Sequence, residues 1–236
     1  MVTTSPSPAG NNARFLAFAS REEASGALAE QVFETLTDAL AAHGKSTLVV
    51  SGGTSPVAFF HRLRQLPLPW ERITVVPSDE RTVPMDDSRR NEAMIRRELL
   101  QGEAAAARLH GLLPASGDTS SLEEIAEALP SSFDAVVLGM GEDGHTASLF
   151  PGSPQLDASL RSTEPLALLD VPALGAKRVS LTPSVLLSTR RVDLLFFGRG
   201  KREVFEAALA GDAIAEYPVR FLLLQNRAPV TVFWAP

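Results

Sequence analysis

Residues 135–152 read AVVLGMGEDGHTASLFPG, and this stretch decides the fold. The apolar residues Ala135 to Leu138 predict a buried strand, which runs without a linker into a loop that holds two carboxylates and His145. In open α/β sheets, ligands bind outside the carboxyl ends of the strands. The loop therefore brings the one side chain that titrates near neutral pH to the edge where a ligand is expected.

Extended apolar segments alternate with helical ones on both sides of this stretch. Apolar residues repeat every four positions between Glu22 and His43, which predicts a helix that ends at Gly44. Continuous apolar strands such as 192–197 are typical of a sheet that helices cover on both faces. The alternation predicts a three-layer, doubly wound, mostly parallel α/β fold. The alternative is an eight-stranded barrel, but only about seven strands are expected and some lack a helix between them.

Seven strands and seven helices are expected along the chain. Strands are predicted at 14–19, 47–50, 73–76, 135–138, 178–181, 192–197 and 230–234, and helices at 22–43, 56–66, 88–100, 121–129, 183–190, 201–209 and 217–225. Residues 101–118 give no clear pattern, and residues 151–172 are expected to be irregular.

Length and composition limit the class of protein. The 236 residues, 44% of them hydrophobic, predict one globular domain over residues 13–236, after a disordered segment at residues 1–12 that is rich in Ser, Pro, Gly and Asn. The absence of cysteine excludes disulfides, thiolate catalysis and cysteine-bound zinc. A net charge of -6 argues against a nucleic-acid partner. Without a membrane-spanning apolar run or a signal peptide, the expected location is cytoplasmic.

Four polar segments follow predicted strands at the point where each strand ends. They are residues 51–55, 79–81, 142–145 and 199–201. If the strands are parallel, all four segments meet at one edge of the sheet. This convergence predicts a site more strongly than any single motif does.

The first of these segments has the properties of a phosphate-binding turn. Its small residues precede a helix in which Thr54 or Ser55 can be the cap and Pro56 fits the first turn, so that free backbone N–H groups face an anion. Lys201, in the first turn of a later helix, lies against the preference of the helix dipole and indicates an anion nearby. Arg178 and Arg220 can add charge to the same pocket, although both are expected at the surface.

The other two segments contain the candidates for chemistry. Arg81 can hold a carboxylate, carbonyl or phosphate oxygen, with Asp79 orienting it. Asp143 is close enough in sequence to orient the ring of His145. The structural alternatives are an ion-paired loop at 79–81 and a histidine without a catalytic role.

Several signatures of other chemistries are missing. The chain has no G-x-S-x-G and no H-E-x-x-H, and its four histidines are far apart, so neither a serine hydrolase elbow nor a metal site is expected. Residues 44–46 resemble the end of a P-loop but precede a strand. The glycines of 139–144 have the spacing of a dinucleotide fingerprint, but Pro151 and Gly152 prevent the helix that should follow. We expect neither a metal nor a cofactor.

The motifs together resemble those of the glucosamine-6-phosphate isomerase/6-phosphogluconolactonase family, and most closely its lactonases. The similarity rests on SGGTSP at 51–56, SDERTVP at 78–84 with Asn91, GMGEDGHTASLFPG at 139–152, and RVSLTPSVLL at 178–187 followed by Lys201. It extends from about Arg14 to Trp234. The resemblance implies a Rossmann-like fold and the hydrolysis of 6-phospho-D-glucono-1,5-lactone in the oxidative pentose phosphate pathway.

Two alternatives accompany this reading. The deaminases of the family, which are aldose-ketose isomerases, have Asn-Glu-Pro where this chain has Leu149-Phe150-Pro151, and Asp-Glu-Tyr where it has residues 79–81. A non-catalytic sugar-phosphate sensor would normally contain a DNA-binding segment, which does not fit before Arg14, and has no use for the His145 loop.

The expected roles follow from the chemistry of a lactone, which needs only a positioned water and a base. His145 is the general base, Asp143 holds its imidazole, and Arg81 stabilises the oxyanion. The remaining predicted residues bind substrate and phosphate or organise the loops; they are Ser51, Gly52, Gly53, Thr54, Ser55, Asp79, Asn91, Gly144, Arg178 and Lys201. The expected partner is a small sugar phosphate, and the protein is expected to be a monomer or weak homo-oligomer.

Overall fold

An eight-stranded sheet runs through the centre of the molecule. The computed structural model describes residues 3–5, 13–171, 175 and 177–236. In the order β1-β2-β11-β10-β7-β3-β4-β6, every neighbouring pair is parallel except the edge pair of β1 and β2. The strands are β1 (Thr3–Ser5), β2 (Ala13–Ala17), β3 (Ser46–Val50), β4 (Ile73–Pro77), β6 (Arg108–Leu109), β7 (Ala135–Gly139), β10 (Val192–Phe197) and β11 (Val230–Ala235).

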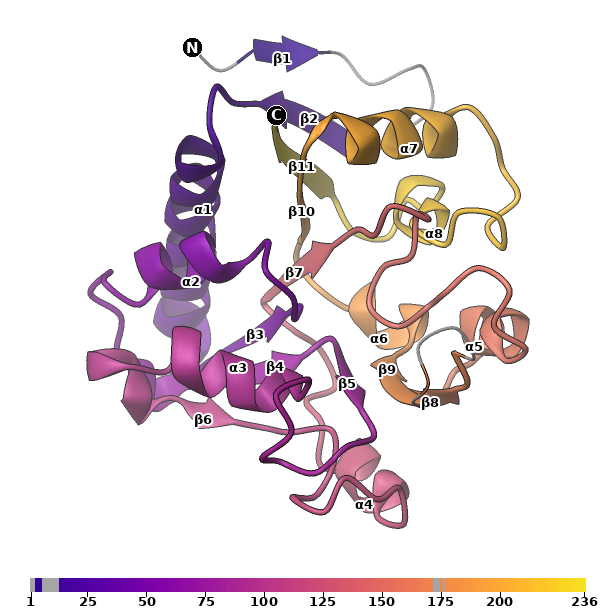
Figure 1. Cartoon of the computed structure of the whole chain (residues 1–236). Helices are drawn as coiled ribbons and strands as arrows, with labels where there is room; N and C mark the ends of the chain where they lie inside the picture. Colours follow the sequence, from indigo (N-terminus) through magenta and orange to yellow (C-terminus); the bar gives the residue numbers. More distant parts are fainter. Residues whose placement is uncertain (1–2, 6–12, 172–174, 176) are drawn as a thin grey trace.

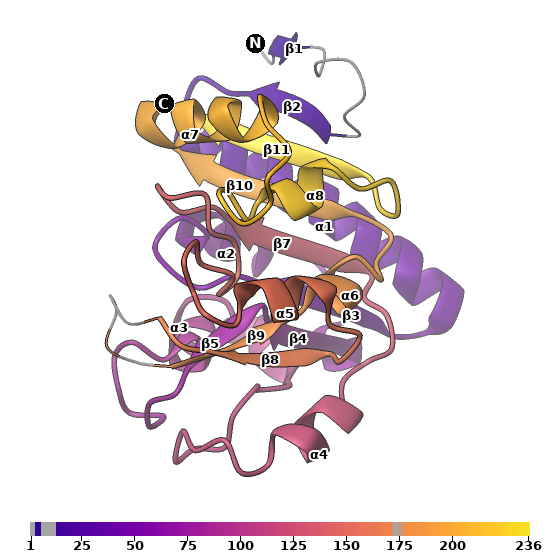
Figure 2. The ribbon, with the colours of Figure 1, turned by 90° about the vertical axis from the view of Figure 1, so that its right-hand side faces the viewer.

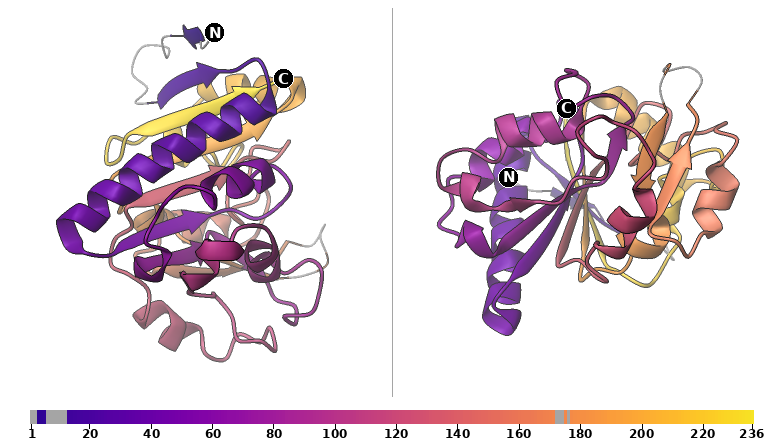
Figure 3. Two further views of the ribbon diagram at one scale, coloured as in Figure 1. Left: turned by 90° about the vertical axis from the view of Figure 1, so that its left-hand side faces the viewer. Right: turned by 90° about the horizontal axis from the view of Figure 1, so that it is seen from below.

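Helices cover both faces of this sheet, as the apolar strands require (Figure 1). On one face lie α1 (Arg21–His43), α2 (Val57–Leu63) and α3 (Asn91–Glu98), with two short 3₁₀ helices at Trp70–Arg72 and Gly102–Ala106. On the other face lie α5 (Leu156–Arg161), α6 (Pro183–Leu186), α7 (Arg199–Leu209) and α8 (Arg220–Leu223). The right-hand view of Figure 3, from below, shows the two helical layers on opposite sides of the sheet. The prediction of a three-layer, doubly wound, mostly parallel α/β fold is confirmed.

The alternation of side chains along each strand builds two cores. Val49 and Val136 pack under α6 to α8, whereas Leu48 and Val137 pack under α1 and α2. Because the central strands β7 and β10 are buried on both faces, their residues are nearly all apolar. The long helix α1 fits the predicted span, with Ser20 accepting a hydrogen bond from the Glu23 backbone N–H and Gly44 ending the helix at a φ of 72°.

The topology has one switch point, between β3 and β7. From β3 the chain continues to β4 and β6 on one side, and from β7 it continues to β10 and β11 on the other. Loops that leave adjacent strands in opposite directions open a crevice at the carboxyl edge, where ligands bind in such folds. The C-terminus, at the end of β11, marks this edge on the left of Figure 2.

A second, smaller sheet was not expected from the sequence. The strands β8 (Leu166–Leu169), β9 (Arg178–Leu181) and β5 (Asp79–Arg81) form an antiparallel sheet in the order β5-β9-β8. The strand predicted at 178–181 therefore exists but belongs to this sheet. The region expected to be irregular at 151–172 contains α5 and β8.

Other differences from the predicted elements are local. The expected disordered segment at 1–12 contains the edge strand β1, and its remaining residues lie outside the described ones. The helix α4 (Leu122–Glu127) begins after Ser121; Ser121 and Glu124 have the spacing that predicts a capping box, but the side chain of Ser121 makes no capping hydrogen bond. The helices α3, α6 and α8 are each shorter than their predicted spans because turns occupy the flanking residues.

Candidate active site

A cavity of about 250 Å³ lies at the carboxyl edge of the sheet, beside the switch point. Three of the four polar segments named from the sequence contribute side chains or backbone to it from β3, β5 and β7, and Lys201 enters from α7. The lining residues are Ser51, Gly52, Gly53, Thr54, Ser55, Asp79, Arg81, Asn91, Gly139, Met140, Gly141, His145, Ala147 and Lys201.

His145 is held in one orientation by its own loop. Its Nδ1 lies 2.6 Å from Oδ1 of Asp143, and its backbone N–H donates to the same oxygen at 3.1 Å. The Phe150 ring stacks on the imidazole at a centroid distance of 4.0 Å and an angle of 28°. With Nδ1 bound to the carboxylate, Nε2 is the ring nitrogen available to a ligand in the cavity.

Asp143 remains a carboxylate in this arrangement. Burial alone would raise the pKa of Asp143, but the hydrogen bond and charge of His145 lower it below its ordinary value. A carboxylate that accepts from Nδ1 fixes the tautomer with a free Nε2 and stabilises the imidazolium after proton transfer. The pair can therefore take a proton from a ligand and return it.

The backbone of the loop leaves room for the imidazole only because residue 141 is glycine. A β-carbon on Gly141 would overlap Cε1 and Nδ1 of His145 and would lie 2.7 Å from Oδ1 of Asp143. Two residues beyond the histidine, Ala147 adopts a φ of 48°, which is uncommon for a residue with a side chain. Such strained positions concentrate at functional sites.

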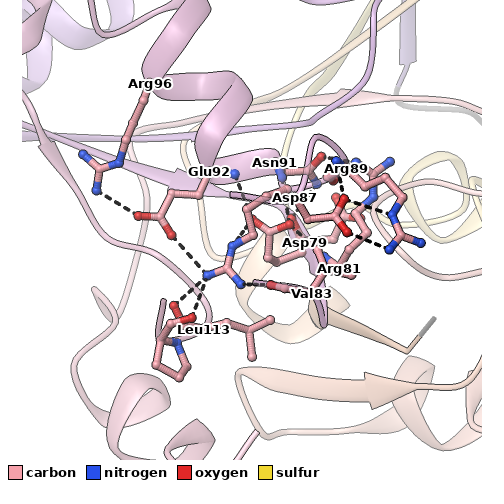
Figure 4. A network of polar contacts seen from close by, with 12 residues as sticks. Asp79, Arg81, Val83, Asp87, Arg89, Asn91, Glu92, Arg96 and Leu113 are labelled. Carbon is pink, nitrogen blue, oxygen red and sulfur yellow. Dashed lines mark hydrogen bonds and ion pairs between the residues drawn. The ribbon is translucent and has the colours of Figure 1, made fainter. Parts of the chain in front are cut away.

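Asn91 holds the guanidinium of Arg81 at another part of the cavity (Figure 4). Arg81 donates to Oδ1 of Asn91 at 2.7 Å and to the backbone carbonyl of Arg89 at 2.6 Å. Asn91 in turn donates to the backbone carbonyl of Asp79 at 2.8 Å. The prediction that Asp79 orients Arg81 is therefore wrong: the carboxylate of Asp79 accepts from Ser78 at 2.8 Å and from Ser148 at 2.6 Å.

A fully buried ion pair supports this loop from below. Glu80 accepts from the backbone N–H groups of Asn91 and Glu92, both at 2.8 Å, and its Oε2 lies 3.4 Å from Nε of Arg90. Arg90 also donates to the backbone carbonyls of Val83, Leu113 and Pro114. Figure 4 shows this network beneath the start of α3. It ties the strand that contains Arg81 to the helix that contains Asn91.

Positive charge surrounds the site more widely than its lining shows. Lys201 has no hydrogen bond or ion pair among the described residues, and burial lowers its pKa although Glu142 and Asp143 oppose that shift. Arg178 lies opposite Arg81 in the β5–β9 pair, and burial and the charge of Arg81 lower its pKa. Like charges on directly paired strand residues are unfavourable. An anion in the cavity would relieve this repulsion.

Several predicted site residues lie outside the cavity or have a different structural role. Arg178 is buried but does not line the cavity, and Arg220 is buried away from it, donating to carbonyls of Ala207, Ala208 and Ala213, so the expectation that both lie at the surface is wrong. Gly144, with a φ of 75°, packs against Tyr217 and does not line the cavity. Neither Thr54 nor Ser55 caps a helix: α2 begins after Pro56, without a side-chain capping bond.

Other functional neighbours were missed in the sequence. The stacking of Phe150 on His145 has no signature in the sequence. Ser148 reaches Asp79 from a segment 69 positions away, and Arg90 is completely buried despite its charge. The spacing of small residues at 139 and 141 could have indicated close backbone packing, because glycines after a strand often mark it.

The fold and the site define a class: a doubly wound α/β protein whose switch point joins a glycine-rich loop and cationic side chains to a histidine–carboxylate pair. The chain belongs to the family of glucosamine-6-phosphate isomerases and 6-phosphogluconolactonases, whose model matches residues 19–234.

Individual relatives support this membership. A 6-phosphogluconolactonase of Pseudomonas aeruginosa is 44% identical over 225 residues, which cover 91% of each chain. The crystal structure of a 6-phosphogluconolactonase from Shewanella baltica is 34% identical, with a TM-score of 0.91, over 94% of this chain and 97% of that one. A monomeric glucosamine-6-phosphate deaminase is 20% identical with a TM-score of 0.75, a likeness that concerns the fold alone.

Proposed function

We propose that this protein hydrolyses 6-phospho-D-glucono-1,5-lactone to 6-phospho-D-gluconate, the lactonase step of the oxidative pentose phosphate pathway. The observation that carries the proposal is the His145–Asp143 pair, 2.6 Å apart, in a cavity that also contains Lys201 and the loop Ser51–Ser55. Relatives named 6-phosphogluconolactonase that are 34–44% identical over most of the chain support it.

The base acts on water. Nε2 of His145 takes a proton from the water that attacks C1, because Nδ1 is already bound to Asp143. The tetrahedral intermediate collapses with cleavage of the bond between C1 and the ring oxygen, and the imidazolium returns the proton to that oxygen. A lactone is an activated ester, so this sequence needs neither a covalent nucleophile nor a metal.

The other groups bind charge. Arg81, positioned by Asn91, stabilises the oxyanion that develops on the carbonyl oxygen. The backbone of Gly52 to Ser55 and the ammonium of Lys201 hold the phosphate at the distant end of the substrate. Arg178 adds positive potential from behind Arg81 without direct contact with the cavity.

The alternative function, that of a deaminase, needs a glutamate that this chain does not have at the corresponding position. Phe150 stacks on the histidine at the position where the deaminases have glutamate, so no second carboxylate from that triplet is available for proton transfer. An apolar ring also keeps the imidazole in place without donating to it. This arrangement favours hydrolysis over isomerisation.

The test compares two substrates with the purified protein in the absence of added metal. Freshly generated 6-phosphogluconolactone should release acid faster than its spontaneous hydrolysis, and glucosamine 6-phosphate should release no ammonia. Ammonia release without lactone hydrolysis would select the deaminase, and no turnover of either compound would select a sensor. A cytoplasmic location and a monomeric or weakly associating state remain parts of the proposal. Among the described residues, no helix has the length and apolarity needed to cross a membrane.

A further inference from the structure

A second and larger cleft lies at the opposite edge of the sheet, where the parallel strands begin. It has a volume of about 1000 Å³ and is bounded by the end of α1, the starts of β3 and β4, and the segments that precede β7 and β10. Ser46 lines this cleft and Ser51 lines the active-site cavity. Five residues of extended chain separate the two sites by about 16 Å.

The walls of the cleft are basic in a protein that is acidic overall. Among the lining residues, Lys45, Arg108, Arg190 and Arg227 are positive and only Asp134 is negative, whereas the whole chain has a net charge of -6. A concave surface lined by one sign of charge focuses the electric potential and concentrates counter-ions. The charge of the cleft therefore favours an anion over a cation.

The one carboxylate pairs with only one of the four cations. Oδ2 of Asp134 accepts from the backbone N–H of Thr47 at 2.8 Å and from its hydroxyl at 3.0 Å, which joins β3 to the start of β7. Its other oxygen is 3.9 Å from Arg190. Asp134 thus serves the strand pairing, and no side-chain hydrogen bond or ion pair is found for Lys45 or Arg108 among the described residues.

Polar side chains from neighbouring strands form the floor. Thr47 on β3 is in register with Thr74 on β4, which is in register with Arg108 on β6, so the three side chains point to the same face in a row. Adjacent strands are about 4.8 Å apart, so this row spans about 10 Å. The lining adds the hydroxyls of Ser131 and Ser132, whereas those of Ser188 and Thr189 donate to backbone carbonyls. Such a surface matches phosphate oxygens spread over several ångströms.

Arg190 is already positioned within the cleft. Its guanidinium donates to Nε2 of His43 at 3.0 Å, which requires the neutral imidazole as acceptor. Among the described residues, Arg227 makes one side-chain hydrogen bond, at 3.5 Å to the carbonyl of Ser184. The donors face the cleft from helix ends and loops on several sides.

We infer that this cleft binds a small phosphorylated polyanion with at least two phosphate groups, at a site separate from the active site. Thr74 and Arg108 with Lys45 hold one group, and Arg190 with Arg227 holds the other. The inference does not depend on the proposed function, because no residue of the active-site cavity takes part. Nucleotides, sugar bisphosphates and pyrophosphate share the required chemistry.

Calorimetric titration with pyrophosphate tests the inference, and titrations with ATP and fructose 1,6-bisphosphate distinguish the sources. The Lys201→Ala protein is used because it weakens phosphate binding in the active site. We expect one equivalent of pyrophosphate to bind, and Lys45→Ala/Arg108→Ala to weaken this binding by about tenfold or more. The control with the same change in charge is Arg62→Ala/Arg161→Ala, at exposed positions outside the cleft. It should bind as the parent does.

Equal affinities of the parent and the Lys45→Ala/Arg108→Ala protein would overturn the inference. An equal loss in both double variants would do so too, because it would reflect general charge attraction. In a background with Lys201 intact, Lys45→Ala/Arg108→Ala should retain the parent catalytic rate. This separates the cleft from the active site whatever reaction the protein catalyses.

Discussion

The glycine at position 141 offers a direct test of the site, because a single methyl group there acts on the imidazole. In Gly141→Ala, the new β-carbon would overlap Cε1 and Nδ1 of His145 and lie 2.7 Å from Oδ1 of Asp143. The residue does not have a positive φ, so the backbone itself tolerates alanine. The effect is therefore steric and local.

Two contacts hold the ring in its present position. Phe150 stacks on it at 4.0 Å, and Nδ1 is 2.6 Å from Asp143, so relief of the overlap must break one of these contacts. Crowding of this kind costs about 1–3 kcal/mol of stability. A displacement of about 1 Å in a catalytic group can lower the rate by about 100-fold. We expect kcat to fall by about that factor while KM stays nearly constant, since the phosphate contacts are untouched.

The assay follows proton release from freshly generated 6-phosphogluconolactone, with the spontaneous rate subtracted. Gly26→Ala is the matched control: it adds a methyl group in α1 where nothing lies within 4 Å, so it should leave kcat unchanged and stabilise the helix by about 0.5–1 kcal/mol. A Gly141→Ala protein that folds and keeps kcat within about twofold of the parent would refute the proposed placement of His145.

Four further predictions concern single residues. His145→Ala should lower kcat by about 100-fold or more, and a near-normal rate would exclude it as the base. Lys201→Ala should mainly raise KM, whereas an unchanged KM would remove its ammonium from phosphate binding. Arg90→Leu leaves Glu80 buried without its cation and should lower the free energy of unfolding by about 3–5 kcal/mol in urea; a loss below about 1 kcal/mol would contradict this. Burial raises the pKa of Asp193 from 3.8 to about 6, so the folded protein keeps a proton that the unfolded chain has lost within this window. The free energy of unfolding should therefore fall as pH rises from about 4 to about 6, by at most about 3 kcal/mol, and Asp193→Asn should abolish that fall in urea titrations at several pH values.

Periodicity in the sequence predicted the elements that local composition determines. The sequence of α1 is compatible only with a helix, since its buried residues repeat at helical spacing. The continuous apolar runs of β7 and β10, bounded by turn residues, indicate buried strands. The small sheet of β5, β8 and β9 was missed because its strands are three or four residues long and pair across distant segments. Only β9 was predicted as a strand, because segments of three or four residues are too short to show a period.

The same distinction applies to the site. The order of polar segments after strands was visible in the sequence, because parallel strands must bring their carboxyl ends to one edge. The partners of individual side chains were not visible. Asp79 accepts from Ser148, which is distant in sequence, instead of serving Arg81 two positions away. The guanidinium of Arg220 donates its hydrogen bonds to backbone carbonyl groups at the end of α7 and does not reach the cavity. Only three-dimensional packing decides such choices.

The pairing of β3 with β7 has a consequence for folding kinetics. Leu48 lies in register with Ala135, so the two halves of the crevice meet through a contact between segments almost ninety positions apart. Contacts of such long sequence separation form late, because closing a long loop must precede them. Helix formation can thus recover during refolding before any turnover does. The return of enzymatic activity should mark the moment at which this central pair closes.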